Sequence, residues 1–311
     1  MNGYKITITG GAGFIGSNLA EELTGKNEVT VFDDLSTGNM GNIAGLDVKL
    51  IRGSITDSGA LKSAFAGTDY VFHLAARRSV PRSRREPILV NAVNVTGTLN
   101  VLVAARDAGV KKVVFAASSS AYGDTPTLPK VETMAPNPLS PYAITKLTGE
   151  LYCRVFNDVY RLPTVALRYF NVYGPRQDPD SEYAAVIPKF VRALKAGHPP
   201  VIFGDGEQTR DFTYVGDAVR GTILAAELSG AYGNVVNISV GKRITLNGLS
   251  RKLGELTGRA DIKTQHASPR DGDVRHSLAD ITLASESLGY EPAHSIDEGL
   301  GRVVASIAGK E

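Results

Sequence analysis

Three glycines directly after the first apolar strand constrain the fold of this chain more than any other feature. Gly10, Gly13 and Gly16 lie in the segment Thr-Gly-Gly-Ala-Gly-Phe-Ile-Gly, between an apolar strand at 4–8 and an amphipathic helix at 12–23. Glycines at this spacing allow a tight turn and bring backbone N–H groups to a pyrophosphate at the helix N-terminus. The alternative is a tight turn without a ligand. The strand-loop-helix context favours a dinucleotide site.

Asp33 ends the second predicted strand, about twenty residues after the glycines. A carboxylate at this place accepts hydrogen bonds from both ribose hydroxyls and repels a 2′-phosphate. The alternative is an aspartate that only forms a turn, and Asp34 is able to share the role. The pattern favours NAD over NADP.

The first half of the chain alternates between strands and helices. Further apolar runs predict strands at 28–32, 48–51, 70–74, 112–116 and 164–167, with helical spacing at 57–66, 88–107 and 140–160. Repeated strand-helix-strand units pair their strands in parallel through right-handed crossovers. The sequence therefore predicts an α/β fold, a doubly wound parallel sheet of the Rossmann type.

The character of the sequence changes after Asn171. Prolines and glycines become dense, as at 173–177 and 197–200, and the predicted elements become short. We expect an NAD-binding Rossmann domain at 1–170 and a smaller C-terminal substrate-binding lobe at 171–311. A helix at 215–227 is expected to pack back onto the first domain, so that 211–230 belong with it.

Composition argues against several other classes of protein. The 311 residues carry a net charge of +2, so no nucleic-acid partner is expected. The only cysteine, Cys153, forms no internal disulfide, which fits a cytoplasmic protein, and five scattered histidines predict no metal site. We see no signal peptide and no run of about 18 apolar residues that would predict a membrane span. Five arginines between Arg77 and Arg85 form either a solvated loop or an anion contact.

A phenol and an ammonium lie four residues apart in the predicted helix at 140–160. Tyr142 and Lys146 therefore share one helix face, and the lysine together with a bound nicotinamide cation is expected to lower the tyrosine pKa from its usual value of about 10. Ser118 follows the strand at 112–116, at the sheet edge where ligands of such folds bind. Its alternative role is that of a helix cap. Together the three residues predict acid–base chemistry on a substrate hydroxyl.

These motifs resemble the extended short-chain dehydrogenase/reductase superfamily, and within it the UDP-glucose/UDP-N-acetylglucosamine 4-epimerase family. The resemblance covers nearly the whole chain. The stretches that carry it are Leu74-Ala75-Ala76, Ser79-Val80-Pro81-Arg82-Ser83, 117–124, Leu139-Ser140-Pro141-Tyr142, Leu167-Arg168-Tyr169-Phe170-Asn171-Val172-Tyr173-Gly174 and 270–280.

The resemblance implies a role for each matching residue. Catalysis would fall to Ser118, Tyr142 and Lys146. The cofactor would be NAD, held by the glycines together with Phe14, Ile15, Asp33, Asp34, Ser36, Thr37, Gly38, Ser54, Ile55, Leu74, Ala75, Arg78, Asn94, Tyr142, Lys146 and Tyr169. The UDP-sugar would be held by Ser118, Ser119, Asn171, Ala185, Val186, Phe203, Arg210, Arg270, Asp273 and Ser277. Taken singly, Val186 and Phe203 could be core residues, Asn171 a turn former and the arginines surface charges.

Two positions depart from the family pattern. Ser54 stands where the family usually has an aspartate that faces the adenine amine, which puts adenine recognition in doubt. Arg78 stands where members of the group have lysine or glycine. It could contact the cofactor phosphates or be exposed.

The resemblance implies reversible C4 epimerisation through a 4-keto sugar. Ser119 and Ser120 stand where related dehydratases and decarboxylases place acidic residues, so those reactions are disfavoured. Ser277 matches a gate position that is tyrosine in strict glucose/galactose epimerases, so UDP-GlcNAc and UDP-GalNAc are expected to be accepted as well as UDP-glucose and UDP-galactose.

Three other functions remain open: a UDP-glucuronate 4-epimerase, an NAD-dependent keto-sugar nucleotide reductase, and a nonenzymatic NAD sensor. The helices at 88–107 and 140–160 resemble those that form a dimer interface in the superfamily, which implies a homodimer.

Overall fold

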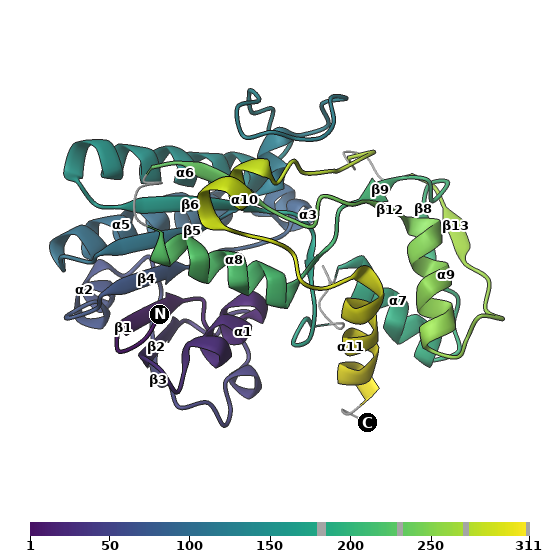
Figure 1. Ribbon diagram of the computed structural model, residues 1–311, viewed down its shortest axis with the longest axis horizontal. Helices are drawn as coiled ribbons and strands as arrows, with labels where there is room; N and C mark the ends of the chain where they lie inside the picture. The colour runs from purple at the N-terminus through teal and green to yellow at the C-terminus, as the bar shows by residue number, and fades with distance from the viewer. Residues whose placement is uncertain (179–184, 229–232, 270–273, 309–311) are drawn as a thin grey trace.

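Seven parallel strands form the central sheet, in the order β11-β6-β5-β4-β1-β2-β3 (Figure 1). The structure is a computed structural model that describes residues 1–178, 185–228, 233–269 and 274–308. The strands are β1 (Lys5–Thr9), β2 (Glu28–Asp33), β3 (Lys49–Arg52), β4 (Tyr70–His73), β5 (Lys112–Ser118), β6 (Thr164–Tyr169) and β11 (Val235–Ile238). The strand order reverses between β1 and β4, which is where ligands bind in such folds. The predicted fold class is confirmed.

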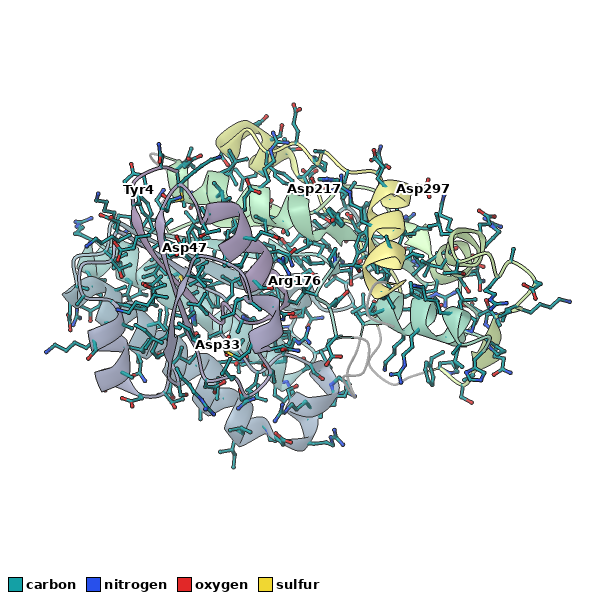
Figure 2. All side chains as sticks on the ribbon, turned by 90° about the horizontal axis from the view of Figure 1, so that it is seen from below. Tyr4, Asp33, Asp47, Arg176, Asp217 and Asp297 are labelled. Carbon is teal, nitrogen blue, oxygen red and sulfur yellow. The ribbon has the colours of Figure 1, made fainter. Side chains whose placement is uncertain are left out.

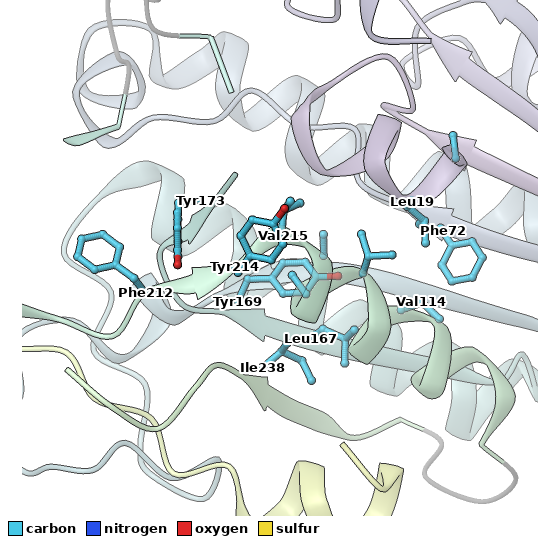
Figure 3. Packing of buried hydrophobic residues seen from close by; sticks show 14 of the residues in the cluster. Leu19, Phe72, Val114, Leu167, Tyr169, Tyr173, Phe212, Tyr214, Val215 and Ile238 are labelled. Carbon is cyan, nitrogen blue, oxygen red and sulfur yellow. The ribbon is translucent and has the colours of Figure 1, made fainter. Parts of the chain in front are cut away.

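Helices cover both faces of the sheet. Helices α1 (Phe14–Leu23) and α8 (Val215–Glu227) pack together on one face. On the other face lie α2 (Ser58–Ala64), α5 (Gly97–Asp107) and α6 (Pro141–Tyr160). Each face buries its own apolar core. Figure 3 shows Leu167, Tyr169 and Ile238 within the core on the α8 side.

The helix predicted at 88–107 is continuous but contains one wider turn. It consists of α4 (Pro87–Asn91), a π-helical turn η2 (Ala92–Thr96) and α5. Within the described residues, Pro87–Asp107 is also the one helix long and apolar enough to cross a membrane, which the sequence analysis did not anticipate. This is weak evidence for a membrane span, because the core helix of a soluble protein passes the same test. Here the helix packs against α2 and α6.

A smaller lobe lies at one end of the sheet, on the right in Figure 1. Its helices α7 (Val186–Lys195), α9 (Leu246–Leu256) and α11 (Ile296–Ala308) pack on one another. Three two-stranded sheets support it: β7 (Val172–Tyr173) with β10 (Thr213–Tyr214), β8 (Val201–Phe203) with β13 (Gln265–Ala267), and β9 (Thr209–Arg210) with β12 (Ile244–Thr245). The short elements are η1 (Met40–Asn42), α3 (Val80–Arg85), η3 (Ser119–Tyr122) and α10 (Thr282–Leu288).

The chain crosses between the two parts several times. Helix α8 packs against β5 and β6. Strand β11 forms the edge of the central sheet, although its residues, 235–238, fall in the range that was predicted to belong to the lobe. The pattern did not predict β11, because four apolar-rich residues among many glycines carry no clear periodicity. Arg176, labelled in Figure 2, joins the lobe side to α1 through Glu21 (2.8 Å) and the carbonyl of Ser17 (3.2 Å).

Candidate active site

The glycine-rich loop leaves no room for side chains. Gly10 has a φ of +73°, and a Cβ on it would lie 2.7 Å from the nitrogen of Ala75. A Cβ on Gly16 would lie 2.3 Å from the carbonyl oxygen of Gly10. Helix α1 begins after Gly13 without a side-chain cap, so its first N–H groups point to this loop. This is a cradle for a pyrophosphate, and the residues fit a bound dinucleotide.

Asp33, labelled in Figure 2, ends β2 beside this loop, and its side chain is buried. Its carboxylate accepts from the backbone N–H of Ala12 at 3.0 Å and of Leu35 at 2.8 Å. Burial raises the pKa of Asp33, and these two hydrogen bonds oppose the shift. The aspartate therefore shapes its own turn and still offers lone pairs to a ribose. Asp34 lies 3.8 Å from the guanidinium of Arg77.

A cavity of about 290 Å³ opens at the carboxyl ends of β1, β2, β4 and β5. It gathers most residues predicted to bind the cofactor: Gly10, Gly13, Phe14, Ile15, Gly16, Asp33, Asp34, Ser36, Thr37, Gly38, Ile55, Leu74, Ala75, Arg78, Tyr142, Lys146 and Tyr169. Ser54 is not among its lining residues and instead hydrogen-bonds Thr56 at 2.8 Å. The cavity also includes Arg77 and Val93, which the sequence analysis did not assign. The arginine cluster, as a possible anion contact, was the sequence signal that could have pointed to Arg77.

Asn94 lies behind this cavity, in the π-helical turn, with 2% of its surface exposed. Its Oδ1 accepts from the N–H of Arg77 at 2.7 Å, and its Nδ2 donates to the carbonyl of Arg77 at 3.1 Å. The same Nδ2 donates to Thr145 Oγ1 at 3.0 Å. Asn94 thus fastens the loop after β4 to helix α6, rather than lining the cavity itself.

Ser118 and Tyr142 meet in the cavity. Ser118 ends β5 and accepts from Ser120 N at 3.2 Å and from Ser120 Oγ at 2.9 Å. Tyr142 lies in the first turn of α6, where Ser140 caps the helix and Pro141 starts it. The Tyr142 side chain lines the same cavity as Ser118, whose hydroxyl lowers the pKa of the phenol. A hydroxyl and a phenol therefore lie in one cavity at the sheet edge, where the sequence placed them.

Lys146 lies one helical turn after Tyr142 and is buried. Its Nζ donates to the carbonyl of Ala116 at 2.6 Å and lies 4.9 Å from the centre of the Phe115 ring. Burial lowers the pKa of Lys146 to about 8, which the charge of Glu150 opposes.

The pKa of Tyr142 moves in the direction opposite to the expectation. Burial raises it, while the neighbouring Ser118 hydroxyl and the charge of Arg78 lower it. The phenol is buried, and the loss of hydration of the phenolate outweighs the stabilisation by the polar groups of the protein.

A second cavity of about 630 Å³ lies in the lobe and shares Val172 with the first. It is lined by five residues predicted to hold the substrate: Asn171, Ala185, Val186, Phe203 and Arg210. Phe190, Gln208 and Phe212 line it too, and no motif marked them. Arg210 donates to the carbonyl of Thr209 at 3.0 Å.

The remaining predicted substrate residues fall into two groups. Ser119 and Ser277 lie outside the lining of this cavity, although Ser277 is close to it. The Oγ of Ser277 accepts from Asn171 Nδ2 at 3.2 Å and from the N–H of Asp211 at 3.3 Å. Arg270 and Asp273 lie outside the described residues.

A Rossmann sheet with a glycine cradle and a serine–tyrosine–lysine set defines a nucleotide-dependent enzyme of the short-chain dehydrogenase/reductase class. Residues 6–239 match the NAD-dependent epimerase/dehydratase family, and the chain belongs to that family. The predicted family and the NAD cofactor are confirmed.

Three proteins illustrate the similarity. The UDP-glucose 4-epimerase of Mycolicibacterium smegmatis is 38% identical over 308 residues, which cover 96% of this chain and 97% of that protein. The solved UDP-N-acetylglucosamine 4-epimerase from Methanobrevibacter ruminantium M1, in complex with UDP-N-acetylmuramic acid, is 40% identical, with a TM-score of 0.96 and 100% coverage of both chains. The UDP-glucose 4-epimerase from Thermotoga maritima with UDP-glucose is 41% identical, with a TM-score of 0.94, covering 98% of this chain and 99% of that one.

Proposed function

We propose that the protein catalyses reversible C4 inversion of a UDP-hexose through a transient 4-keto sugar, with bound NAD. The observation that carries the proposal is the gathering of Ser118, Tyr142 and Lys146 around one cavity at the carboxyl edge of the sheet, beside the glycine cradle. The cavity around this set adjoins the lobe cavity at Val172, so one extended ligand can reach both. The similar proteins named UDP-sugar 4-epimerases support the same reaction class.

Different residues of the chain would bind the cofactor, transfer the proton and bind the nucleotide. Gly10, Gly16 and Asp33 would hold NAD, which supplies a reversible hydride acceptor when it is bound. Tyr142 would take the proton of the sugar 4-hydroxyl through Ser118 and later return it. The ammonium of Lys146 would favour the phenolate form of Tyr142 electrostatically, in the same direction as the charge of Arg78. The lobe cavity would anchor the nucleotide while the keto sugar turns over.

Ser119 and Ser120 support epimerisation over dehydration and decarboxylation. The hydroxyl of Ser120 donates to Ser118 Oγ at 2.9 Å, beside the proposed reacting carbon. Hydroxyls do not serve as an acid/base pair near neutral pH, whereas elimination of water from the sugar requires such a pair. A sugar held here would therefore be oxidised and reduced at C4 without further loss of atoms.

The experiment is to incubate the purified protein separately with UDP-galactose and UDP-GlcNAc and to follow C4 by NMR. We expect inversion of both sugars. The second candidate function is a UDP-glucuronate 4-epimerase, and a panel that also contains UDP-glucuronate tests it. Arg78 favours this function, because its cationic side chain lines the cavity and its charge acts on Tyr142. If UDP-glucuronate alone is inverted, UDP-glucuronate is the substrate in place of UDP-galactose and UDP-GlcNAc. No inversion of any sugar would refute the proposed reaction.

We infer that the pocket admits a 2-acetamido group because Ser277 is small and is held by Asn171 and Asp211. Ser277→Tyr should abolish turnover of UDP-GlcNAc and spare UDP-galactose. Ser277→Ala is the matched control, because it removes the hydroxyl and keeps the space. If Ser277→Tyr slows both substrates equally, the gate assignment fails.

Cofactor retention separates an epimerase from a reductase. An epimerase regenerates NAD in every turnover, so the purified protein should carry bound NAD. A keto-sugar nucleotide reductase must exchange its cofactor, and a protein that only senses NAD needs no catalytic set. Release of the dinucleotide by denaturation and measurement of its amount decides between these cases.

We propose a cytoplasmic homodimer that pairs through α6. Four apolar side chains lie exposed along one stripe of this helix: Ile144, Leu151, Val155 and Val159. Exposed apolar patches of this kind mark interfaces. Light scattering should give twice the mass of the chain, and Leu151→Glu should give monomers, whereas Leu256→Glu on the lobe should not. A monomeric wild-type protein would refute this assembly.

A further inference from the structure

A buried ion pair lies behind Lys146 and has no role in the mechanism above. Arg168 in β6 donates from Nε to Glu150 Oε1 at 2.9 Å and from Nη2 to Glu150 Oε2 at 2.7 Å. The two side chains are 4% and 3% exposed. A buried ion pair adds little net stability compared with well-packed apolar residues. Stability alone therefore does not explain why charges are placed here.

Glu150 lies four residues after Lys146, so the two side chains share one face of α6. The other groups around Lys146 carry no negative charge near neutral pH. They are Cys153 on α6, His73 on β4, and the Ala116 carbonyl and Phe115 ring on β5, with Tyr142 one helical turn earlier on α6. Burial and the charge of Lys146 lower the pKa of His73 to about 3, and burial raises that of the Cys153 thiol. Among the described groups whose charge acts on Lys146, Glu150 is thus the one carboxylate.

Arg168 favours the ionised form of Glu150. Burial raises the pKa of Glu150, and the hydrogen bonds and charge of Arg168 oppose that shift. The guanidinium is itself fixed, because it lies 4.4 Å from the centre of the Tyr122 ring. The Tyr122 hydroxyl in turn donates to Asn237 Oδ1 at 2.8 Å.

We propose that Glu150, held by Arg168, is a positioning residue that keeps Lys146 protonated beside Tyr142. The proposal rests on the proposed function, because it assigns the protonated lysine a part in that reaction. The ion pair thereby extends the site from β5 to β6, and Lys146 would otherwise lose its proton in the desolvated interior.

The test is Glu150→Gln in the NAD-loaded enzyme, with kcat/KM measured from pH 5 to pH 10. The basic limb of the profile should move to lower pH by about one unit. This is the low end of the pKa shift that a nearby opposite charge causes. Cys153→Ala is the matched control, because it alters the same buried helix face without changing a charge, and its limb should stay in place. A Glu150→Gln enzyme with lower activity but an unmoved limb would show that the pair is only structural.

Glu150→Gln leaves Arg168 buried and unpaired, which threatens folding. The double variant Glu150→Gln/Arg168→Met removes both charges and should show the same lowered limb. Restoration of the wild-type limb in the double variant would overturn the proposal.

NMR of ¹³Cε-labelled lysine, assigned with Lys146→Met, reports the titration of Lys146 without any sugar. If no UDP-sugar is inverted but this titration moves down in Glu150→Gln, the charge assignment holds and the proposed function falls. If the wild type inverts the sugar and the titration does not move, the inference falls alone.

Discussion

Replacement of Asn94 by alanine tests whether the π-helical turn couples the cofactor loop to the catalytic helix. Asn94 makes three hydrogen bonds, two to the backbone of Arg77 and one to Thr145. Each is worth about 1 kcal/mol net. Thr145 keeps its bond to the Tyr142 carbonyl at 2.8 Å, and Arg77 is half-buried, so water can replace part of the loss. We therefore expect Asn94→Ala to lower the free energy of unfolding by about 2–3 kcal/mol.

The assay is equilibrium unfolding in urea at a fixed protein concentration, with and without added NAD. Asn91→Ala is the control: this residue lies on the same continuous helix and is exposed, so its change should stay within about 0.5 kcal/mol. Asn94→Ala should also weaken NAD binding, because the loop it holds lines the cofactor cavity. An unfolding free energy within about 0.5 kcal/mol of wild type, together with unchanged NAD affinity, would refute the coupling.

Three further predictions concern the cradle and the catalytic set. Gly16→Ala should lower the free energy of unfolding by about 3 kcal/mol and abolish NAD retention, because its Cβ would lie 2.3 Å from Gly10 O. Gly13→Ala, whose Cβ would lie 3.1 Å from the same oxygen, should lower the free energy of unfolding by about 1 kcal/mol, as measured by thermal unfolding. Tyr142→Phe should lower kcat by at least about 10²-fold with NAD still bound, and near-normal turnover would contradict the assignment. Since the pKa of Lys146 is about 8, its ammonium is present below pH 8 and is lost above it, so kcat/KM should fall above that pH; a flat profile to pH 10 would disagree.

Most of the fold could be predicted from the sequence, because the strongest sequence signals are local. The glycine loop, the strand that ends at Asp33 and the capped helix that begins at Pro141 each follow from neighbouring residues. Tyr142 and Lys146 share a face at any helix position, so their proximity required no tertiary information. The strand order and the packing of α6 on β5 then bring these residues to one cavity.

Other features depend on contacts between distant segments and left no local signal. The pairing of Glu150 with Arg168 joins a helix to a strand eighteen residues later. The wider turn at Asn94 coincides with bonds to Arg77 and Thr145, which periodicity does not reveal. The direction of the Tyr142 pKa shift was wrong for the same reason, since burial is a property of the folded chain.

The most direct test of the account is the fate of the hydrogen at C4. The protein is incubated with unlabelled UDP-galactose in D₂O, and the product is examined by NMR and mass spectrometry. Hydride that leaves C4 and returns within one closed site should give inverted sugar without deuterium at C4. Deuterium at C4 of the inverted sugar would mean that a proton from water is added there, and the proposed chemistry of Tyr142, Ser118 and bound NAD would be wrong.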